Sequence, residues 1–130
     1  VVVARAMYTA PTLQQSRQDT EAPFMWFKET GQEVGAPRDN NVELLPEEYR
    51  AYRGRFARDI TFDYNDMYEN VMLFGTPDDL TARIKDLEKS GVDKIIFFIN
   101  FGGIEHQKVL NSLDLFAKEV MPEFQGAPVA

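Results

Sequence analysis

The chain has 130 residues, of which 44% are hydrophobic and 27% charged, and this composition is typical of one globular domain with a buried core. Its formal net charge of −7, without a cluster of lysines and arginines, argues against nucleic acid or an anionic membrane surface as a partner, because both require a basic face. The absence of cysteine excludes disulfides, thiolate metal ligands and a cysteine nucleophile, and it leads us to expect a cytoplasmic protein.

The first segment predicts a strand followed by a helix. Val1 to Tyr8 is rich in β-branched and apolar residues, so we expect a strand buried on both faces, as in a parallel sheet. Thr12 and Gln15 have capping-box spacing and predict a helix that ends near Gly31. Pro23 lies within this helix and should kink or split it, because proline has no backbone N–H to donate.

Residues 31–63 have a weaker pattern and predict an insertion, which in α/β enzymes often forms a lid or a wall of the substrate site. Its first part is loop-like. Pro46 and two following acids then predict the start of a helix with Tyr49, Tyr52 and Phe56 on one face. We expect these rings to pack the helix, with a substrate wall as the alternative. The stretch "YNDMYEN" then predicts one more helical turn.

A second strand–helix unit follows. Asn70 to Gly75 predicts a short buried strand, and Thr76 is expected to cap the next helix with its hydroxyl. Gly91 should end that helix, with Val92 packing back on Leu87 as in a Schellman motif.

The third unit closes the chain. Lys94 to Asn100 is a continuous apolar run and predicts a parallel strand covered on both faces. Gly102 and Gly103 are expected to turn the chain into a final helix that Pro122 ends. The expected inner stripe of that helix is Val109, Leu110, Leu113, Phe116, Ala117, Val120 and Met121.

The predicted order of elements is strand–helix, insertion, strand–helix and strand–helix. This alternation implies right-handed crossovers and a parallel sheet with helices packed outside it. Three parallel strands alone leave two unpaired edges and one poorly covered face. We therefore expect further strands, either from a longer chain or from a partner.

The second half of the sequence, Val71 to Phe124, resembles the carboxyl-terminal end of the luciferase-like flavin-dependent monooxygenases, the bacterial luciferase superfamily. In that family a Gly-Ser/Thr-Pro opens the penultimate helix, as "GTP" does here, and "GVD" precedes the last strand. A loop of small residues then leads into a helix that ends much like "SLDLFAKEVMP". Residues 1–27 resemble an earlier strand–helix unit more loosely, and residues 31–63 match no part of the family.

The resemblance implies an α/β fold, the carboxyl-terminal part of a TIM-like (β/α)8 barrel, with about three βα units, parallel strands and the insertion at 31–63. A whole barrel needs about 250 residues, and the chain begins without methionine, so we expect residues 1–130 to belong to a larger enzyme. Family members bind reduced flavin, usually FMN and in some branches F420, at the carboxyl end of the barrel. The FMN members react it with O2 to form a flavin peroxide that oxygenates an organic substrate.

The loop from Asn100 to His106 follows the last predicted strand and would lie at the mouth of such a barrel. Asn100 and His106 are candidate catalytic residues, and His106, the single histidine, is a candidate proton relay. Gly102 and Gly103 are candidate cofactor-binding residues, because glycine permits close backbone approach to a flavin. The alternatives are structural: polar residues near a first helical turn are more often exposed or local caps, and turns require glycines anyway.

Two other patterns favour a structural role. Free amides at the start of the helix after "GTP" suit a phosphate, but Asp78 and Asp79 already occupy that electropositive end, so we expect plain capping. Trp26 with Phe24 and Phe27 resembles a stacking platform, although such neighbours on a helix more often pack against the sheet. The sequence contains no metal-ligand spacing.

The leading hypothesis is a fragment of a flavin-dependent monooxygenase that uses reduced flavin and O2 to oxygenate a small organic substrate, with a flavin reductase as the partner that supplies the flavin. Alone, the chain should bind flavin poorly, because the family grips the flavin phosphate mainly with earlier segments. One alternative is a non-catalytic α/β half-barrel or partner subunit, completed by a homo-oligomer or by the remainder of a barrel. Another is an F420-dependent oxidoreductase that transfers hydride.

Overall fold

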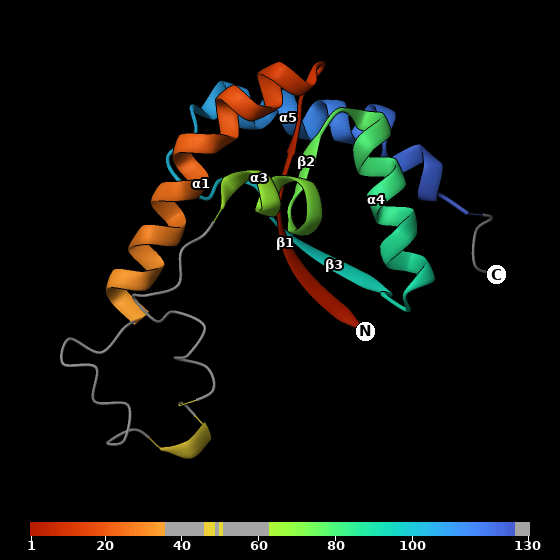
Figure 1. The fold of residues 1–130 in the computed structure, drawn as a ribbon. Helices are drawn as coiled ribbons and strands as arrows, with labels where there is room; N and C mark the ends of the chain where they lie inside the picture. The colour runs from red at the N-terminus through yellow and green to blue at the C-terminus, as the bar shows by residue number, and fades with distance from the viewer. Residues whose placement is uncertain (36–45, 49, 51–62, 127–130) are drawn as a thin grey trace.

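The computed structural model describes residues 1–35, 46–48, 50 and 63–126, and helices pack around a parallel sheet in it (Figure 1). The predicted helix face with Tyr49, Tyr52 and Phe56 lies outside the described residues. The elements in chain order are β1 (Val2–Thr9), α1 (Leu13–Gly35), α3 (Tyr64–Asp66), the π-helical turn η2 (Met67–Val71), β2 (Leu73–Gly75), α4 (Pro77–Lys89), β3 (Lys94–Phe98), α5 (His106–Glu119) and the 3-10 turn η3 (Met121–Phe124).

The three strands form one parallel sheet in the order β2-β1-β3. The carboxyl-terminal part of β1 pairs with β2, in the register Met7 with Leu73, and its amino-terminal part pairs with β3, in the register Val2 with Lys94. The predicted parallel strands are therefore confirmed. The first strand lies between the other two, a placement that the order of elements along the chain does not reveal.

Side chains alternate along the strands and feed two hydrophobic clusters, one on each face of the sheet. The first cluster contains Tyr8 and Phe74 from the strands and Phe24 from α1. The second contains Met7 and Leu73, the neighbouring strand residues that point the other way. The other buried residues of this cluster come from α4, from the second half of α5 and from the C-cap of α5: Leu80, Ile84, Phe116 and Val120. Helix α5 crosses the carboxyl-terminal half of β1 (Figure 1) and contributes to both clusters.

Two strand predictions are wrong in the same way. Only the carboxyl-terminal half of β1 is buried on both faces, and β3 alternates between exposed and half-buried residues. On the side of the sheet that α1 covers, the helix reaches only the carboxyl-terminal halves of the strands. We name the remaining, largely exposed part the open face, made of Val2, Ala4, Ile96 and Phe98, in which Val2, Ile96 and Phe98 keep 57%, 53% and 48% of their surface exposed.

The first helix also differs from its prediction. It is not split by Pro23 and runs past Gly31 to Gly35, although its axis bends along its length in Figure 1. Gly31 does not adopt the positive φ that a glycine stop requires. Phe24, next to the proline, is 1% exposed and its ring lies 5.7 Å from that of Phe74. We infer that this packing outweighs the intrinsic cost of proline in a helix.

The start of the second unit is more helical than predicted. The turn expected from "YNDMYEN" is confirmed as α3 and η2, but η2 extends to Val71, so β2 begins only at Leu73. The predicted caps of α4 are confirmed. Thr76 and Asp79 form a capping box, and Val92 N–H donates to Leu87 C=O at 3.1 Å in a Schellman ending with Gly91 at a φ of 92°.

The last helix is rotated relative to the predicted stripe. Val109, Phe116 and Val120 are buried as expected, whereas Leu110, Ala117 and Met121 are exposed. Ser112 is buried instead, because its hydroxyl accepts a hydrogen bond from Thr9 N–H at 2.8 Å and so satisfies a buried backbone donor of β1. Helix α5 ends at Glu119, and Pro122 lies within η3.

Candidate functional site

The carboxyl ends of the parallel strands meet at one end of the sheet, and the segments that follow them begin at Ala10, Thr76 and Ile99. In parallel α/β proteins ligands bind at this end. All four sequence-predicted site residues lie in the segment after β3 or at the first residue of α5. This is therefore the end of the molecule where a site is expected.

Asn100 shapes the loop after β3. Its Oδ1 accepts a hydrogen bond from Ile104 N–H at 3.0 Å, and its Nδ2 donates to Ile104 C=O at 3.3 Å. The amide oxygen and the amide nitrogen of Asn100 are thus both bonded to the backbone of Ile104. The side chain of Ile104 is buried in the first hydrophobic cluster. This arrangement gives Asn100 a clear structural role, and a catalytic role for it stays a prediction.

The two loop glycines are required for different reasons. A Cβ on Gly102 would lie 2.1 Å from the carbonyl oxygen of Pro23, so only glycine allows the loop to approach the backbone of α1 this closely. Gly103 has a φ of 71° with open space around it, and its conformation alone favours glycine. A flavin contact by either amide stays a prediction.

His106 is the exposed first residue of α5. Among the described residues its side chain has no hydrogen bond or ion pair. His106 lies on the same segment as Gly102 and Gly103 at the carboxyl end of the sheet, and within the described part of the chain no hydrogen bond joins it to Asn100, whose amide is bonded to Ile104.

A buried carboxylate, Asp19, forms the centre of a polar cluster at the same end of the sheet, and the sequence analysis missed it. Asp19 is 8% exposed. Its Oδ2 accepts from Tyr8 Oη at 2.7 Å and from Gln15 Nε2 at 2.8 Å, while its Oδ1 pairs with Lys108 Nζ at 3.0 Å. These four side chains come from β1, α1 and α5. Only the i, i+4 spacing of Gln15 and Asp19 was visible along the chain.

The charge states in this cluster follow from its contacts. Burial raises the pKa of Asp19, but the hydrogen bonds from Gln15, Tyr8 and Lys108 outweigh burial and hold that pKa below its ordinary value. The hydrogen bond and charge of Asp19 raise the pKa of Lys108. Burial, followed by the contact with Asp19, raises the pKa of Tyr8 well above its ordinary value. At neutral pH the cluster therefore contains an ion pair and a protonated phenol.

A cavity of about 550 Å³ lies beside this cluster, between the first turns of α1 and the outer side of α5. Its lining includes Tyr8, Gln15, Asp19 and Lys108, together with Asn111. The volume lies within the range of small-molecule pockets. This cavity is the clearest place on the described part of the chain for a small ligand.

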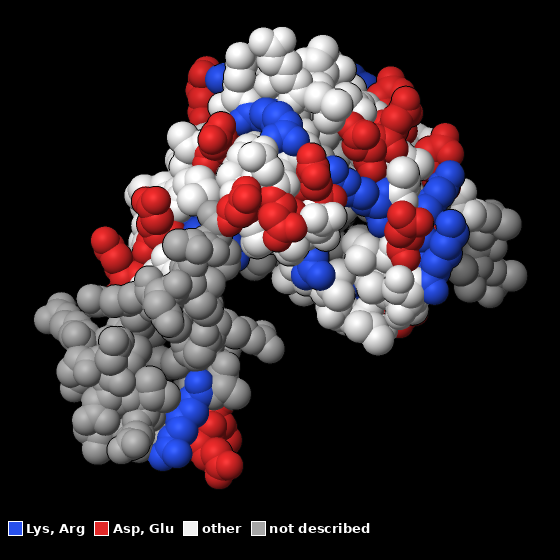
Figure 2. Space-filling model, in the orientation of Figure 1, with Lys and Arg blue, Asp and Glu red and all other residues white. Residues whose placement is uncertain are grey.

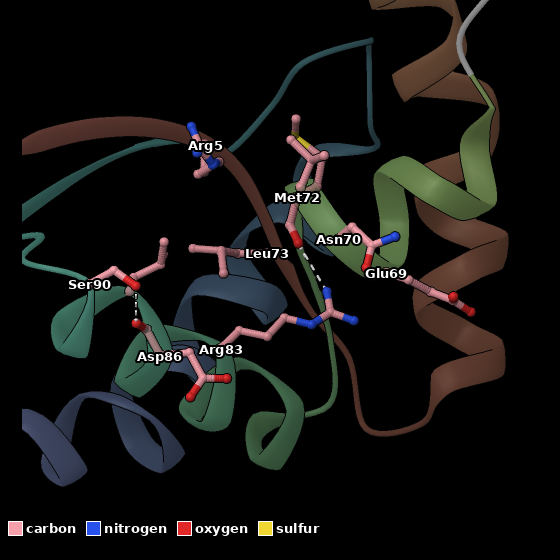
Figure 3. A pocket seen from close by; sticks show the side chains of 10 residues that line it. Arg5, Glu69, Asn70, Met72, Leu73, Arg83, Asp86 and Ser90 are labelled. Carbon is pink, nitrogen blue, oxygen red and sulfur yellow. Dashed lines mark hydrogen bonds between the residues drawn. The ribbon is translucent and has the colours of Figure 1, made fainter.

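A second hollow of about 270 Å³ lies at the other end of β2 and is shown in Figure 3. Arg83 reaches across it from α4 and donates through Nη1 to the carbonyls of Tyr68, Met72 and Phe74 at 2.7, 2.9 and 3.1 Å. These carbonyls belong to η2, to the residue that caps its carboxyl end and to β2. Arg83 therefore has a structural role as the cap of this turn.

The start of α4 is occupied by a carboxylate of the chain itself. The Oδ2 of Asp79 accepts from Thr76 N–H at 3.0 Å and from Thr76 Oγ1 at 2.7 Å, so a carboxylate of the chain occupies the place where a phosphate would bind. The expected plain capping is confirmed.

The aromatic residues of α1 differ in burial, and they do not form one stacking surface. Phe24 packs in the core, whereas Trp26 is 56% exposed.

No described helix is long and apolar enough to cross a membrane. Among the described residues no group of His, Asp and Glu side chains gathers as a metal site would require. Acidic and basic side chains are interspersed on the face shown in Figure 2, and no continuous basic surface appears on it.

Comparisons with known proteins support the fold class. No family model matches the sequence, and no curated protein matches it. The structure is similar to that of the monooxygenase RslO1 from Streptomyces bottropensis, with a TM-score of 0.59 over 95% of this chain at 19% identity. It is also similar to a type II Baeyer-Villiger monooxygenase in complex with FMN, the oxygenating constituent of 3,6-diketocamphane monooxygenase from the CAM plasmid of Pseudomonas putida. The TM-score of this second comparison is 0.60 over 94% of this chain, at 18% identity.

The chain spans 30% and 33% of the length of these two monooxygenases. At such low identity the similarity shows the fold alone. The expected fold class is confirmed: an α/β fold with three parallel strands that matches part of barrel-like monooxygenase chains.

The described residues do not by themselves fit FMN. A flavin phosphate needs several free donors or cations together. At the carboxyl end of the sheet the amide of Thr76 is bonded to Asp79, and the charge of Lys108 is neutralised by Asp19. If flavin binds, other residues must hold its phosphate.

Proposed function

We propose that this chain is part of a flavin-dependent monooxygenase whose whole protein uses reduced flavin and O2 to oxygenate a small organic substrate. The observation that supports this most directly is the fold similarity to two monooxygenases over nearly the whole chain. The resemblance of residues 71–124 to luciferase-like monooxygenases supports it independently. When bound, flavin would supply the reaction with O2, and the chain would contribute one part of the wall around it.

Within this proposal, Asn100 and His106 are the catalytic candidates and Gly102 and Gly103 are the flavin contacts. The exposure of Gly103 and His106 at the carboxyl end of the sheet supports their access to a ligand. The side chain of Asn100 would act by holding the loop in place, because both of its polar groups bond to Ile104.

The test is the intact mass and flavin content of the product of the native gene. We expect a mass about three times that of this chain, because the chain spans 30% and 33% of the two similar monooxygenases. That product should transfer one oxygen atom of O2 to an organic substrate in the presence of reduced FMN, with the other oxygen atom leaving as water and the FMN becoming oxidised, whereas the 130-residue chain alone should bind FMN weakly. A tight one-to-one complex of the isolated chain with FMN would contradict the weak binding. A gene product that neither binds reduced FMN nor forms an oxygenated product with it would overturn the proposed function.

A second candidate is a non-catalytic α/β module that associates with itself or with a partner subunit. The open face favours it, because apolar strand residues that the described helices leave about half exposed gain from burial against another surface. Under this alternative the gene product has the mass of this chain and binds no flavin.

A further inference from the structure

The cavity beside Asp19 offers hydrogen-bond donors that the described residues do not use. Lys108 carries three N–H donors, and among the described residues only the donor directed at Asp19 has a partner. Its side chain lines the cavity and is 43% exposed. Two donors of this ammonium group therefore remain for a ligand.

Asn111 extends this donor surface by nearly one turn of α5. Its Oδ1 accepts from Gln107 Nε2 at 2.9 Å, which fixes the side-chain amide with its oxygen directed at Gln107. The Nδ2 group has no partner among the described residues, and Asn111 lines the cavity with Lys108. An acceptor oxygen of a ligand can thus be held by an ammonium group and an amide from the same helix.

The charges around the cavity select the ligand class. Lys108 is neutralised by Asp19, and Lys118 pairs with Asp114 at 2.7 Å. Glu119 is the remaining charged residue of the lining, so the lining as a whole has a net charge of −1. An anion would gain less from Lys108 than from an unpaired cation, because Asp19 already neutralises that charge, and it would meet the negative charge of Glu119.

A cation is also disfavoured at the donor end of the cavity. Lys108 and Asn111 would direct N–H groups at it, and the carboxylate of Asp19 has already accepted three hydrogen bonds. The lining also contains the apolar surfaces of Ala10, Pro11 and Leu115. These favour a hydrocarbon portion next to the polar group.

We propose that the cavity between α1 and α5 binds a neutral organic molecule whose acceptor oxygen is held by Lys108 and Asn111 and whose hydrocarbon part lies on Pro11 and Leu115. Asp19 positions Lys108 for this contact. The site uses only residues of this chain and needs no flavin, so it stands apart from the proposed function.

The test is a titration of the isotopically labelled chain followed by amide chemical shifts, with three probes that share one ring. The neutral probe is cyclohexanecarboxamide, the anion is cyclohexanecarboxylate and the cation is cyclohexylmethylamine. We expect the carboxamide to give saturable shifts at Ala10, Lys108 and Asn111, with the millimolar affinity usual for so small a ligand. The two charged probes should bind more weakly than the carboxamide, by about fivefold or more. The carboxylate has acceptor oxygens but carries a negative charge, and the ammonium probe carries a positive charge and has no acceptor oxygen.

Asn111→Leu should weaken carboxamide binding about three- to tenfold, the usual effect of losing one hydrogen bond. Asn70→Leu is the matched control, because Asn70 is also an exposed helical asparagine with an i, i+4 side-chain bond, to Asp66, and it lies outside this cavity. The proposal would be overturned if both variants lost the same carboxamide affinity, or if either charged probe bound more tightly than the carboxamide. Chemical shift changes confined to residues outside the cavity would also overturn it.

Discussion

At the scale of single residues, the most informative group is the carboxylate of Asp19. A buried charge is unfavourable unless it is paired and hydrogen-bonded. Asp19 satisfies this condition with three donors from three different elements. One residue thereby ties β1, α1 and α5 together at the carboxyl end of the sheet.

Asp19→Asn should lower the free energy of unfolding at pH 7 by about 1–3 kcal/mol, because it removes the charge that Lys108 pairs with and leaves a buried amide in its place. The pKa of Asp19 is lower in the folded chain than in the unfolded one, so its contribution is present above the unfolded pKa of about 4. The contribution is lost as pH falls through the folded pKa. The difference between wild type and variant should therefore shrink below about pH 4 in urea unfolding experiments.

Asp114→Asn is the control, because Asp114 forms an exposed i, i+4 pair with Lys118. Its effect should stay below about 1 kcal/mol at every pH. A difference for Asp19→Asn that stays constant down to about pH 2 would contradict a lowered pKa for Asp19.

At the scale of elements, two contacts between segments decide local structure. One is the contact of the loop after β3 with α1, where Gly102 lies against the carbonyl of Pro23. The other is the pair of hydrogen bonds that Arg83 of α4 donates to the carbonyls of Tyr68 in η2 and of Met72, the residue after it. In both cases the identity of a residue in one element follows from the backbone atoms of another element that it contacts.

Gly102→Ala should destabilise the fold by about 2–3 kcal/mol, because the new Cβ would overlap a backbone carbonyl that cannot move without shifting α1. Gly103→Ala should cost only about 1 kcal/mol, from its left-handed backbone. Gly126→Ala meets nothing within 4 Å and should be nearly neutral. Thermal or chemical unfolding of the three variants measures this order, and a Gly102→Ala variant as stable as Gly126→Ala would contradict the close approach.

Arg83→Met should lower the free energy of unfolding by about 2–3 kcal/mol, because three partly buried carbonyls lose a charged donor while the aliphatic stem is retained. Lys85→Met is the matched control on the same helix, since Lys85 has only a loose surface ion pair with Glu123 at 3.8 Å. Equal losses in urea unfolding would show that Arg83 acts through general charge and not as a cap.

At the scale of the whole molecule, the open face is the main unsatisfied feature of the described structure. The strands bury their apolar residues where α1, α4 and α5 cover them and expose them elsewhere. Phe27 of α1 lies at the border, with its ring centroid 6.5 Å from that of Phe98. Further protein surface packed on this face would complete the sheet in the way α/β domains require.

We expect the isolated chain to self-associate through this face in light-scattering measurements at rising concentration. Ile96→Lys should weaken the association at least about tenfold, because a charged group would have to be buried. Leu110→Lys is the control, since Leu110 is an exposed apolar residue on α5 outside the open face. A chain that remains monomeric over the whole concentration range, or equal effects of both variants, would contradict this use of the face.

Predictions from local sequence were confirmed where the physical cause is local. The capping box of Thr76 and Asp79 and the Schellman ending at Gly91 join residues within one helical end, so spacing along the chain is sufficient to find them. Asp19 and Lys108 are 89 residues apart, and no periodicity connects them. The candidate residues after β3 were found because loops after parallel strands have a known location, although their roles stay predictions.

The sequence by itself determined the alternation of strands and helices, the parallel sheet and most helix ends, because hydrophobic period and capping chemistry act within a few residues. Its resemblance to barrel-type monooxygenases also agreed with the fold. Only the tertiary structure decided the central place of β1, the half-covered strands, the glycine required at 102 and the cluster around Asp19. Each of these depends on which distant segments pack together, and the balance of burial and hydrogen bonding that selects such packing is a property of the whole fold.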